Sequence, residues 1–324
     1  MTRTSLKSVA IIAVVLVALA GLALAYAPIV YAELAHLTHS LPGWPPSLIA
    51  EPPPGPRSGS VVDGYWRVFE IAQNTYAIGE PEGDPDNFEY LLIGSDRALL
   101  IDAGATARDI HPALATLTRL PVTVIPTHLH YDHTNGLRNF SSIALIDLPQ
   151  TRSRVEQGVF HFSRYEYMGS RGRDPPLFRV TERVKPDAYI DLGQRRLQLL
   201  WTPGHTVTSI SIHDPGAKLL FTGDLIYPTT LYAFMPDSSL STYVATADRL
   251  LETLPADTIL YGAHCCRNDG PPAAPWLDMQ DLRDVRRAVQ DIRSGSADGR
   301  GFILRRYPVN TRMTLVTLFP FGNR

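Results

Sequence analysis

Apolar residues along the chain follow two different periods, which predict strands in some stretches and helices in others. Short apolar runs typical of buried strands occur at 122–125, 197–201, 219–220 and 258–261. Helical spacing is found at 243–254 and again at 282–292. We expect Ser241 or Thr242 to cap the first helix and Pro255 to end it. Both helices are expected to lie on the outside of a sheet.

A dense polar cluster follows the first of these apolar runs. Residues 127–133 read Thr-His-Leu-His-Tyr-Asp-His, although the whole chain has only 10 histidines. Neutral imidazole and carboxylate are the usual ligands of metal ions, so the cluster indicates a metal site rather than an exposed polar loop. In an extended stretch His128 and His130 point the same way and can bind one ion. Asp132 and His133 are expected in the following turn, where they can face a second ion.

Three further candidate ligands each follow another apolar run. His205 comes after 197–201, Asp224 after 219–220 and His264 after 258–261. A glycine lies within two residues of each, which permits close approach of the backbone. One such residue alone is usually structural. Four groups in this order predict a site at one edge of a β-sandwich.

The pattern His128-Leu129-His130-Tyr131-Asp132-His133, followed by His205, Asp224 and His264, resembles the metallo-β-lactamase superfamily. The similarity covers roughly residues 65–266, and 90–93 and 99–104 look like the opening strands of that family. It implies an α+β fold, an αββα sandwich, with a site for two metal ions. The ions are usually Zn²⁺, with iron or manganese as alternatives.

The resemblance also implies a role for each ligand. The first ion would be held by His128, His130 and His205. The second ion would be held by Asp132, His133 and His264. Asp224 would bridge the two ions, and Asp102 would orient a ligand imidazole. The sequence around His264 departs from the usual Pro-Gly-His-Gly of the family, but His264 is the only histidine after Asp224.

The bridging residue points to a subgroup of the family. The Phe-Thr-Gly-Asp stretch at 221–224 resembles glyoxalase-II-like thioesterases and lactonases, and 221–254 is loosely similar to acyl-CoA thioesterases. The expected reaction is cleavage of a small thioester, lactone or related ester by a metal-bridging hydroxide. Asp132 and Asp224 would orient the hydroxide, and Tyr227 is a candidate to assist the oxyanion or leaving group. The alternatives are a β-lactam or phosphodiester hydrolase, a mononuclear iron oxygenase, or a binding protein with a decayed site.

Composition narrows the possible partners. The chain has 324 residues, of which 44% are hydrophobic and 19% charged, enough for a sizeable core. Its net charge of −2 gives no broad attraction for nucleic acid, which argues against nuclease branches. Arginines gather beyond residue 282, and we interpret them as a solvated face, with a site for an anionic substrate tail as the alternative. The oligomeric state stays open.

The two cysteines and an aromatic segment each allow two interpretations. Cys265 and Cys266 are the only cysteines, and since a disulfide between neighbours is strained, no disulfide framework is expected. We interpret both as small packing residues, with Cys265 as a possible metal ligand. The segment 157–173 is rich in aromatic residues and is either a substrate lid or ordinary packing.

The N-terminus predicts export. Arg3 and Lys7 precede an uncharged stretch at 8–32, so residues 1–32 are expected to be a transmembrane anchor or a cleaved signal peptide. A proline-rich linker at 33–60 follows, and 61–324 form the catalytic domain. Basic residues before the span place this domain on the extracytoplasmic side, either periplasmic or extracellular.

Overall fold

The computed structural model describes residues 59–81, 86–167, 170, 174–265, 273–301 and 304–318. The predicted anchor or signal peptide, and all but the last two residues of the predicted linker, lie outside the described residues. Within these ranges, no helix combines the length and the apolar character that crossing a bilayer requires.

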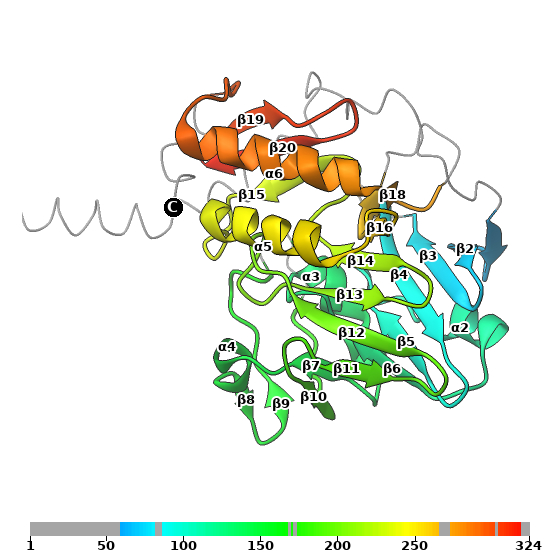
Figure 1. Cartoon of the computed structure of the whole chain (residues 1–324). Coiled ribbons are helices and arrows are strands. Elements are labelled where there is room, and N and C mark those ends of the chain that lie inside the picture. Colours follow the sequence, from blue (N-terminus) through cyan, green and yellow to red (C-terminus); the bar gives the residue numbers. More distant parts are fainter. Residues whose placement is uncertain are drawn as a thin grey trace, which may run out of the picture. The chain divides into compact units, whose positions relative to one another are not determined.

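Two β-sheets form the centre of the fold (Figure 1). The first sheet contains, in spatial order, β1 (Ser60–Val62), β2 (Trp66–Ala72), β3 (Thr75–Glu80), β4 (Asp86–Ile93), β5 (Ala98–Ile101) and β6 (Val122–Ile125). Neighbouring strands are antiparallel except β5 and β6, which are parallel and are joined through α2 (His111–Leu117). A seventh strand, β17 (His264–Cys265), pairs with the start of β4.

In the described part of the chain, the second sheet has six strands. Its order is β11 (Tyr189–Asp191), β12 (Arg196–Trp201), β13 (Ile210–Asp214), β14 (Leu219–Gly223), β16 (Ile259–Gly262) and β18 (Trp276–Leu277). Smaller sheets pair β7 (Ala144–Ile146) with β10 (Glu182–Val184), β8 (Val155–Glu156) with β9 (Val159–Phe160), and β20 (Thr314–Leu318) with both β15 (Thr230–Ala233) and β19 (Leu304–Pro308).

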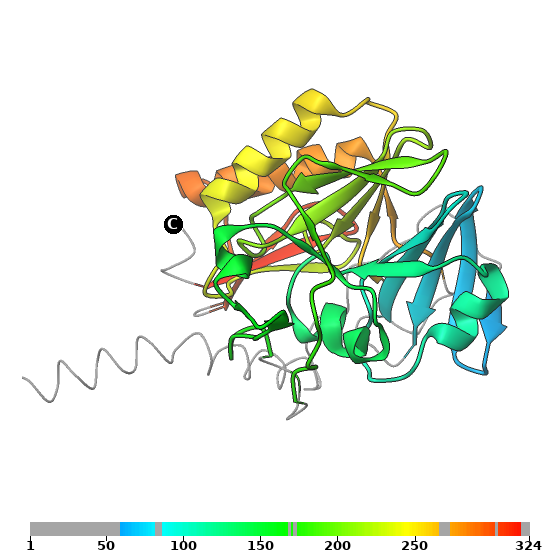
Figure 2. The ribbon, with the colours of Figure 1, turned by 90° about the horizontal axis from the view of Figure 1, so that it is seen from below.

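Three apolar layers hold these elements together. Phe88 and Leu92 of the first sheet meet Leu199 and Phe221 of the second in the central core. The outer face of the second sheet packs against α5 (Leu240–Thr253) and α6 (Met279–Ser294), and the outer face of the first packs against α2. Figure 2 shows this helix–sheet–sheet–helix order. The α+β sandwich expected from the sequence is therefore confirmed.

The two predicted outer helices are present, with one error at a boundary. The helix α5 is capped by Ser239, whose hydroxyl accepts a hydrogen bond from the Thr242 backbone N–H, and not by Ser241 or Thr242. Leu240 is buried, so the apolar face begins earlier than the predicted cap. The chain turns extended at Leu254, immediately before Pro255. In α6 the predicted apolar positions, among them Val285 and Val289, are buried.

Candidate metal centre

The histidine-rich cluster lies where β6 leaves the first sheet. His128 and His130 lie in an irregular connection that bends at both residues, and His130 immediately precedes the short helix α3 (Tyr131–Thr134). Asp132 and His133 were expected in a turn, but they lie within this helix. The chain continues directly from α3 into a 3₁₀ helix, η1 (Asn135–Asn139).

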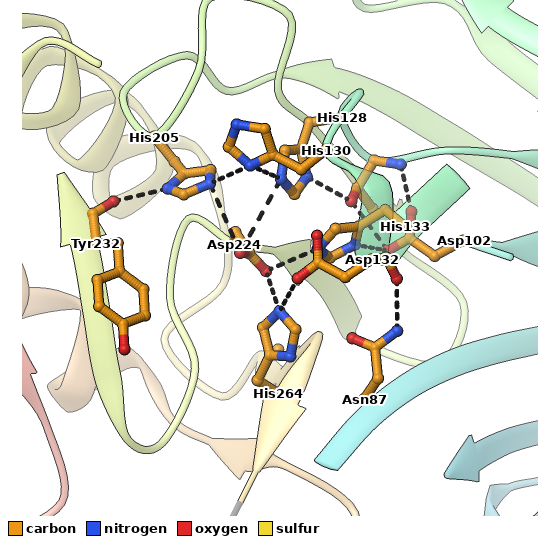
Figure 3. A network of polar contacts seen from close by, with 12 residues as sticks. Asn87, Asp102, His128, His130, Asp132, His133, His205, Asp224, Tyr232 and His264 are labelled. Carbon is orange, nitrogen blue, oxygen red and sulfur yellow. Dashed lines mark hydrogen bonds and ion pairs between the residues drawn. The ribbon is translucent and has the colours of Figure 1, made fainter. Parts of the chain in front are cut away.

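Three imidazoles converge to form the first ligand group (Figure 3). His130 Nδ1 lies 2.9 Å from His128 Nε2 and 3.1 Å from His205 Nε2. Burial, together with the neighbouring imidazoles, lowers the pKa of His128 well below its ordinary value and that of His130 to about 3. Both rings are therefore neutral near pH 7, and their lone pairs are available to a cation.

Asp132, His133 and His264 form the second group. Asp132 reaches both imidazoles, at 3.7 Å from His133 Nε2 and 3.6 Å from His264 Nε2. Burial by itself would lower the pKa of His133, but Asp102, Asp224 and Asp132 together raise it well above its ordinary value. In the metal-free protein the His133 ring is therefore protonated on both nitrogens and positively charged, and a bound cation would replace one of these protons.

Asp224 joins the two groups. Its Oδ2 lies 3.6 Å from His205 Nε2, and its Oδ1 lies 3.2 Å from His264 Nε2 and 3.4 Å from His133 Nε2. Burial would raise the pKa of Asp224, but His264 and His133 hold it well below its usual range, so the carboxylate stays ionised. The structure thus brings all seven predicted ligands together, and Asp224 forms a third group with His128 of the first group and His133 of the second.

The donor atoms fit divalent cations. Among the described residues, His133 Nε2 and Asp224 Oδ1 are buried without a hydrogen-bond partner. Leaving such atoms unsatisfied is costly, and a cation between them would remove that cost. Imidazole nitrogen with carboxylate oxygen is a donor set that suits zinc, iron or manganese.

A carboxylate and a backbone carbonyl orient two of the ligand rings. Asp102 accepts hydrogen bonds from His133 Nδ1 at 2.9 Å and from the backbone N–H of Thr127 at 2.6 Å. The Tyr232 carbonyl accepts a hydrogen bond from His205 Nδ1 at 2.7 Å. A side chain at Gly223 would place its Cβ 2.6 Å from Thr127 Oγ1, so this strand end requires glycine. The contacts of His133 and His205 leave Nε2 of both rings facing the site.

His264 follows the end of β16, as the sequence analysis expects. It also begins a second short strand, β17, which the sequence analysis did not predict and in which His264 lies opposite Asn87 of β4. The Phe88 backbone N–H donates to the Ala263 carbonyl at 2.8 Å, which fastens this strand to the first sheet. His264 is therefore attached to the first sheet, whereas β16, which precedes it in the chain, belongs to the second sheet.

Polar residues of β4 were missed by the sequence reasoning. The Asn87 side-chain amide donates to the Asp132 carbonyl at 2.7 Å and to Glu89 Oε1 at 3.2 Å. Both side chains are buried. The available signal was that Asn87 and Glu89 occupy alternate positions of the strand, so that they share one face of it.

Replacement of Glu89 by glutamine is expected to change how stability depends on pH. Burial, aided by the Glu80 and Asp102 carboxylates, raises the pKa of Glu89 well above its ordinary value. The native state thus keeps a proton that the unfolded chain releases above about pH 4.3. Between about pH 4.3 and the raised pKa of Glu89 in the folded protein, the free energy of unfolding of the wild type should therefore fall, relative to that of Glu89→Gln, by about 1.4 kcal/mol per pH unit.

Urea unfolding of the metal-loaded proteins from about pH 5 to about pH 8 measures this difference. Glu156→Gln is the matched control, because the Glu156 side chain is 79% exposed and its removal should leave the slope unchanged. A constant difference between wild type and Glu89→Gln across this range would contradict the prediction.

Tyr227 lies beside the second ligand group. Its ring centre is 5.0 Å from that of His264, in an edge-to-face arrangement, and the side chain is 1% exposed. Burial and the Asp224 carboxylate raise the pKa of Tyr227 well above its ordinary value, so the phenol is neutral. The structure shows packing against a ligand ring, and a role at the oxyanion stays a prediction.

The cysteine interpretation was partly wrong. Cys265 is buried in the central core, as expected of a packing residue. It is nevertheless in a disulfide, which the sequence reasoning did not expect. The chain contains only one other cysteine, Cys266, which lies outside the described residues. Cys265 is absent from the candidate ligand groups found among the described residues.

The aromatic segment behaves as packing where it is described. Phe160 is fully buried and stacks on Phe178 with ring centres 5.5 Å apart, and Phe162 contacts both rings and Tyr167. Tyr167 Oη also lies 3.2 Å from Thr134 Oγ1, so the segment braces the helix that carries two ligands. These contacts favour the packing alternative over a lid for the described aromatic residues.

Several arginines of the C-terminal region are paired with carboxylates. Arg286 contacts Asp248 at 2.7 Å, and Arg287 contacts Asp284 at 2.5 Å. Arg283 and Arg293 are exposed. These features agree with a solvated charged face, and the alternative of a site for an anionic tail stays untested.

Comparisons with known proteins agree with this geometry. The curated relatives that the chain matches include the acyl-coenzyme A thioesterase MBLAC2 of Gallus gallus, 32% identical over 183 residues, which make up 50% of this chain and 66% of that protein. The chain thus spans slightly less than two thirds of that relative. The hydroxyacylglutathione hydrolase of Bartonella tribocorum is 27% identical over 207 residues, or 63% of this chain and 73% of that protein.

Solved structures support the same fold. The metallo-beta-lactamase from Pontibacter korlensis has a TM-score of 0.53 at 18% identity, covering 70% of this chain and 99% of its own. The family model described as "Metallo-beta-lactamase superfamily" matches residues 89–264, more than half of the chain and all seven candidate ligands. The chain therefore belongs to the metallo-β-lactamase superfamily.

Proposed function

We propose that the protein is a hydrolase with two divalent metal ions, preferably Zn²⁺, that cleaves a thioester or a related small ester. The observation that carries this proposal is the position of Asp224, whose two oxygens face different ligand groups. A mononuclear site would need only the first group, His128, His130 and His205. The second group would then place ionisable side chains together in the interior with no ion to bind, and burying charged groups costs free energy.

The protein's own side chains prepare the site for hydrolysis. Two divalent ions held by these groups would supply a hydroxide nucleophile near neutral pH and polarise a carbonyl. The ionised Asp224 accepts hydrogen bonds, so it can orient the attacking oxygen from between the groups. Asp132 is the more exposed carboxylate, with 24% of its side chain accessible, and can accept a proton at the open side of the site.

The names of the relatives favour thioesters. MBLAC2 is named as an acyl-coenzyme A thioesterase, and the Bartonella relative as a hydroxyacylglutathione hydrolase. We carry this substrate class over as a proposal, because the chain spans only part of each relative. We also propose, from the sequence alone, that residues 1–32 direct the catalytic domain to the extracytoplasmic side.

Metal analysis with a substrate panel tests the function. We expect two zinc ions per chain and release of free thiol from acyl-CoA or acylglutathione substrates, with little turnover of a β-lactam or a phosphodiester. The expected number of ions follows from Asp224, whose two oxygens face different ligand groups, and the expected substrates follow from the names of the relatives. One iron per chain together with oxygen uptake would overturn the proposal.

A further inference from the structure

The second ligand group depends on one residue that contacts both of its distant chain segments. In the pairing of β17 with β4, Asn87 lies opposite His264. The Asn87 side chain meanwhile donates a hydrogen bond of 2.7 Å to the carbonyl of Asp132 (Figure 3). Asn87 therefore touches both the helix and the strand that supply ligands to this group.

The amide of Asn87 has one usable orientation. A backbone carbonyl can only accept, so turning the amide round would place oxygen against the oxygen of Asp132. The same Nδ2 also donates to Glu89 Oε1 at 3.2 Å. The side chain is 1% exposed, and Asn87 Oδ1 has no hydrogen-bond partner among the described residues. The donor contacts therefore hold the amide, and with it the Asp132 backbone.

The first ligand group is oriented by other residues. His205 is held by the Tyr232 carbonyl, and His128 Nδ1 lies 3.2 Å from Thr127 Oγ1. In the described part of the chain, the hydrogen bonds of the Asn87 side chain go to Asp132 and Glu89. A substitution of Asn87 should therefore alter the position of the second ligand group and leave that of the first unchanged.

We propose that Asn87 is a positioning residue that sets the affinity of the protein for its second metal ion, independently of the first. This inference rests on the proposed two-ion function. Groups that orient metal ligands typically change metal affinity about 10- to 100-fold when they are removed. We expect a loss of this size for the second ion in the Asn87→Ala variant, with the affinity for the first ion unchanged.

Zinc titration of the full-length protein against a chromophoric chelator measures both affinities. Asn87→Asp is the second variant, since it keeps the shape of the side chain but presents an acceptor to the Asp132 carbonyl. The matched control is Asn310→Ala. Asn310 Nδ2 also donates to two acceptors, at 3.0 Å in Asp281 and 3.2 Å in Asp284, but none of these residues belongs to the ligand groups.

Selective weakening of the second ion in both Asn87 variants, with none in Asn310→Ala, would support the assignment. Unchanged binding of both ions, or equal weakening of both, would overturn it, because equal weakening indicates a general loss of structure. A wild-type protein that binds a single ion would instead refute the two-ion function before any variant is compared. Should Asn87→Ala fail to fold, Asn87→Asp alone decides between selective weakening of the second ion, which supports the assignment, and unchanged or equal weakening, which overturns it.

Discussion

Asp224→Asn is expected to lower kcat/KM about 1,000-fold, the upper end of the loss seen when one buried group that stabilises a transition state is removed. The carboxylate is 7% exposed and faces His205 with one oxygen and His264 with the other. Asparagine offers a single acceptor oxygen, so it cannot face both ligand groups. Thioester hydrolysis by the purified protein, together with its zinc content, measures the effect.

Asp147→Asn is the matched control for this substitution. The Asp147 side chain is mostly buried and contacts Arg152 at 2.6 Å and Arg183 at 3.6 Å, away from the ligand groups. It makes the same chemical change outside the site and should leave kcat/KM within about twofold. Full activity of Asp224→Asn with two zinc ions bound would contradict the bridging role.

Asp102→Ala is expected to lower the free energy of unfolding by about 3–5 kcal/mol, the usual cost of removing one partner from a buried charged pair. The Asp102 carboxylate is 1% exposed and accepts from His133 Nδ1 and from both the backbone N–H and the hydroxyl of Thr127. Alanine would leave these donors buried without an acceptor. Denaturant unfolding of the metal-loaded protein measures the loss.

Backbone conformation contributes separately to this loss. Asp102 has a φ of 64°, a left-handed conformation that aspartate tolerates better than alanine. Asp63 shares that conformation, with a φ of 54°, on the surface. Asp63→Ala should therefore cost only about 1 kcal/mol. Equal losses in the two variants would mean that the buried hydrogen bonds of Asp102 contribute nothing.

The ligand set could be predicted from the sequence because its chemistry is concentrated. Six residues from His128 to His133 contain four of the candidate ligands, and the other three each follow an apolar run. Because the ligands are so concentrated, the prediction of the ligand set stays correct even where a single helix or turn is predicted wrongly. Asp132 and His133 lie in a helix instead of a turn, yet the same residues still converge.

The contacts between distant segments could not be predicted in the same way. Asn87 is 45 residues from Asp132, and Tyr90, whose hydroxyl donates to the Gly262 carbonyl, is 172 residues from its partner. Local periodicity carries no information about which strand edge will meet which loop. For the same reason the sequence correctly placed His264 after a strand but gave no sign of β17, because the two-residue pairing of β17 with β4 joins distant segments.

The attachment of His264 to β4 also bears on the order in which the site can assemble during synthesis. Translation delivers the first ligand group when His205 has emerged, while His264 is still to be made. A domain folds as a unit, so the ligand residues that are made first gain their final positions only when the later strands of both sheets are present. Completion of the second ligand group must wait until β17 has been made and has docked on β4, so uptake of a second ion would mark completed folding.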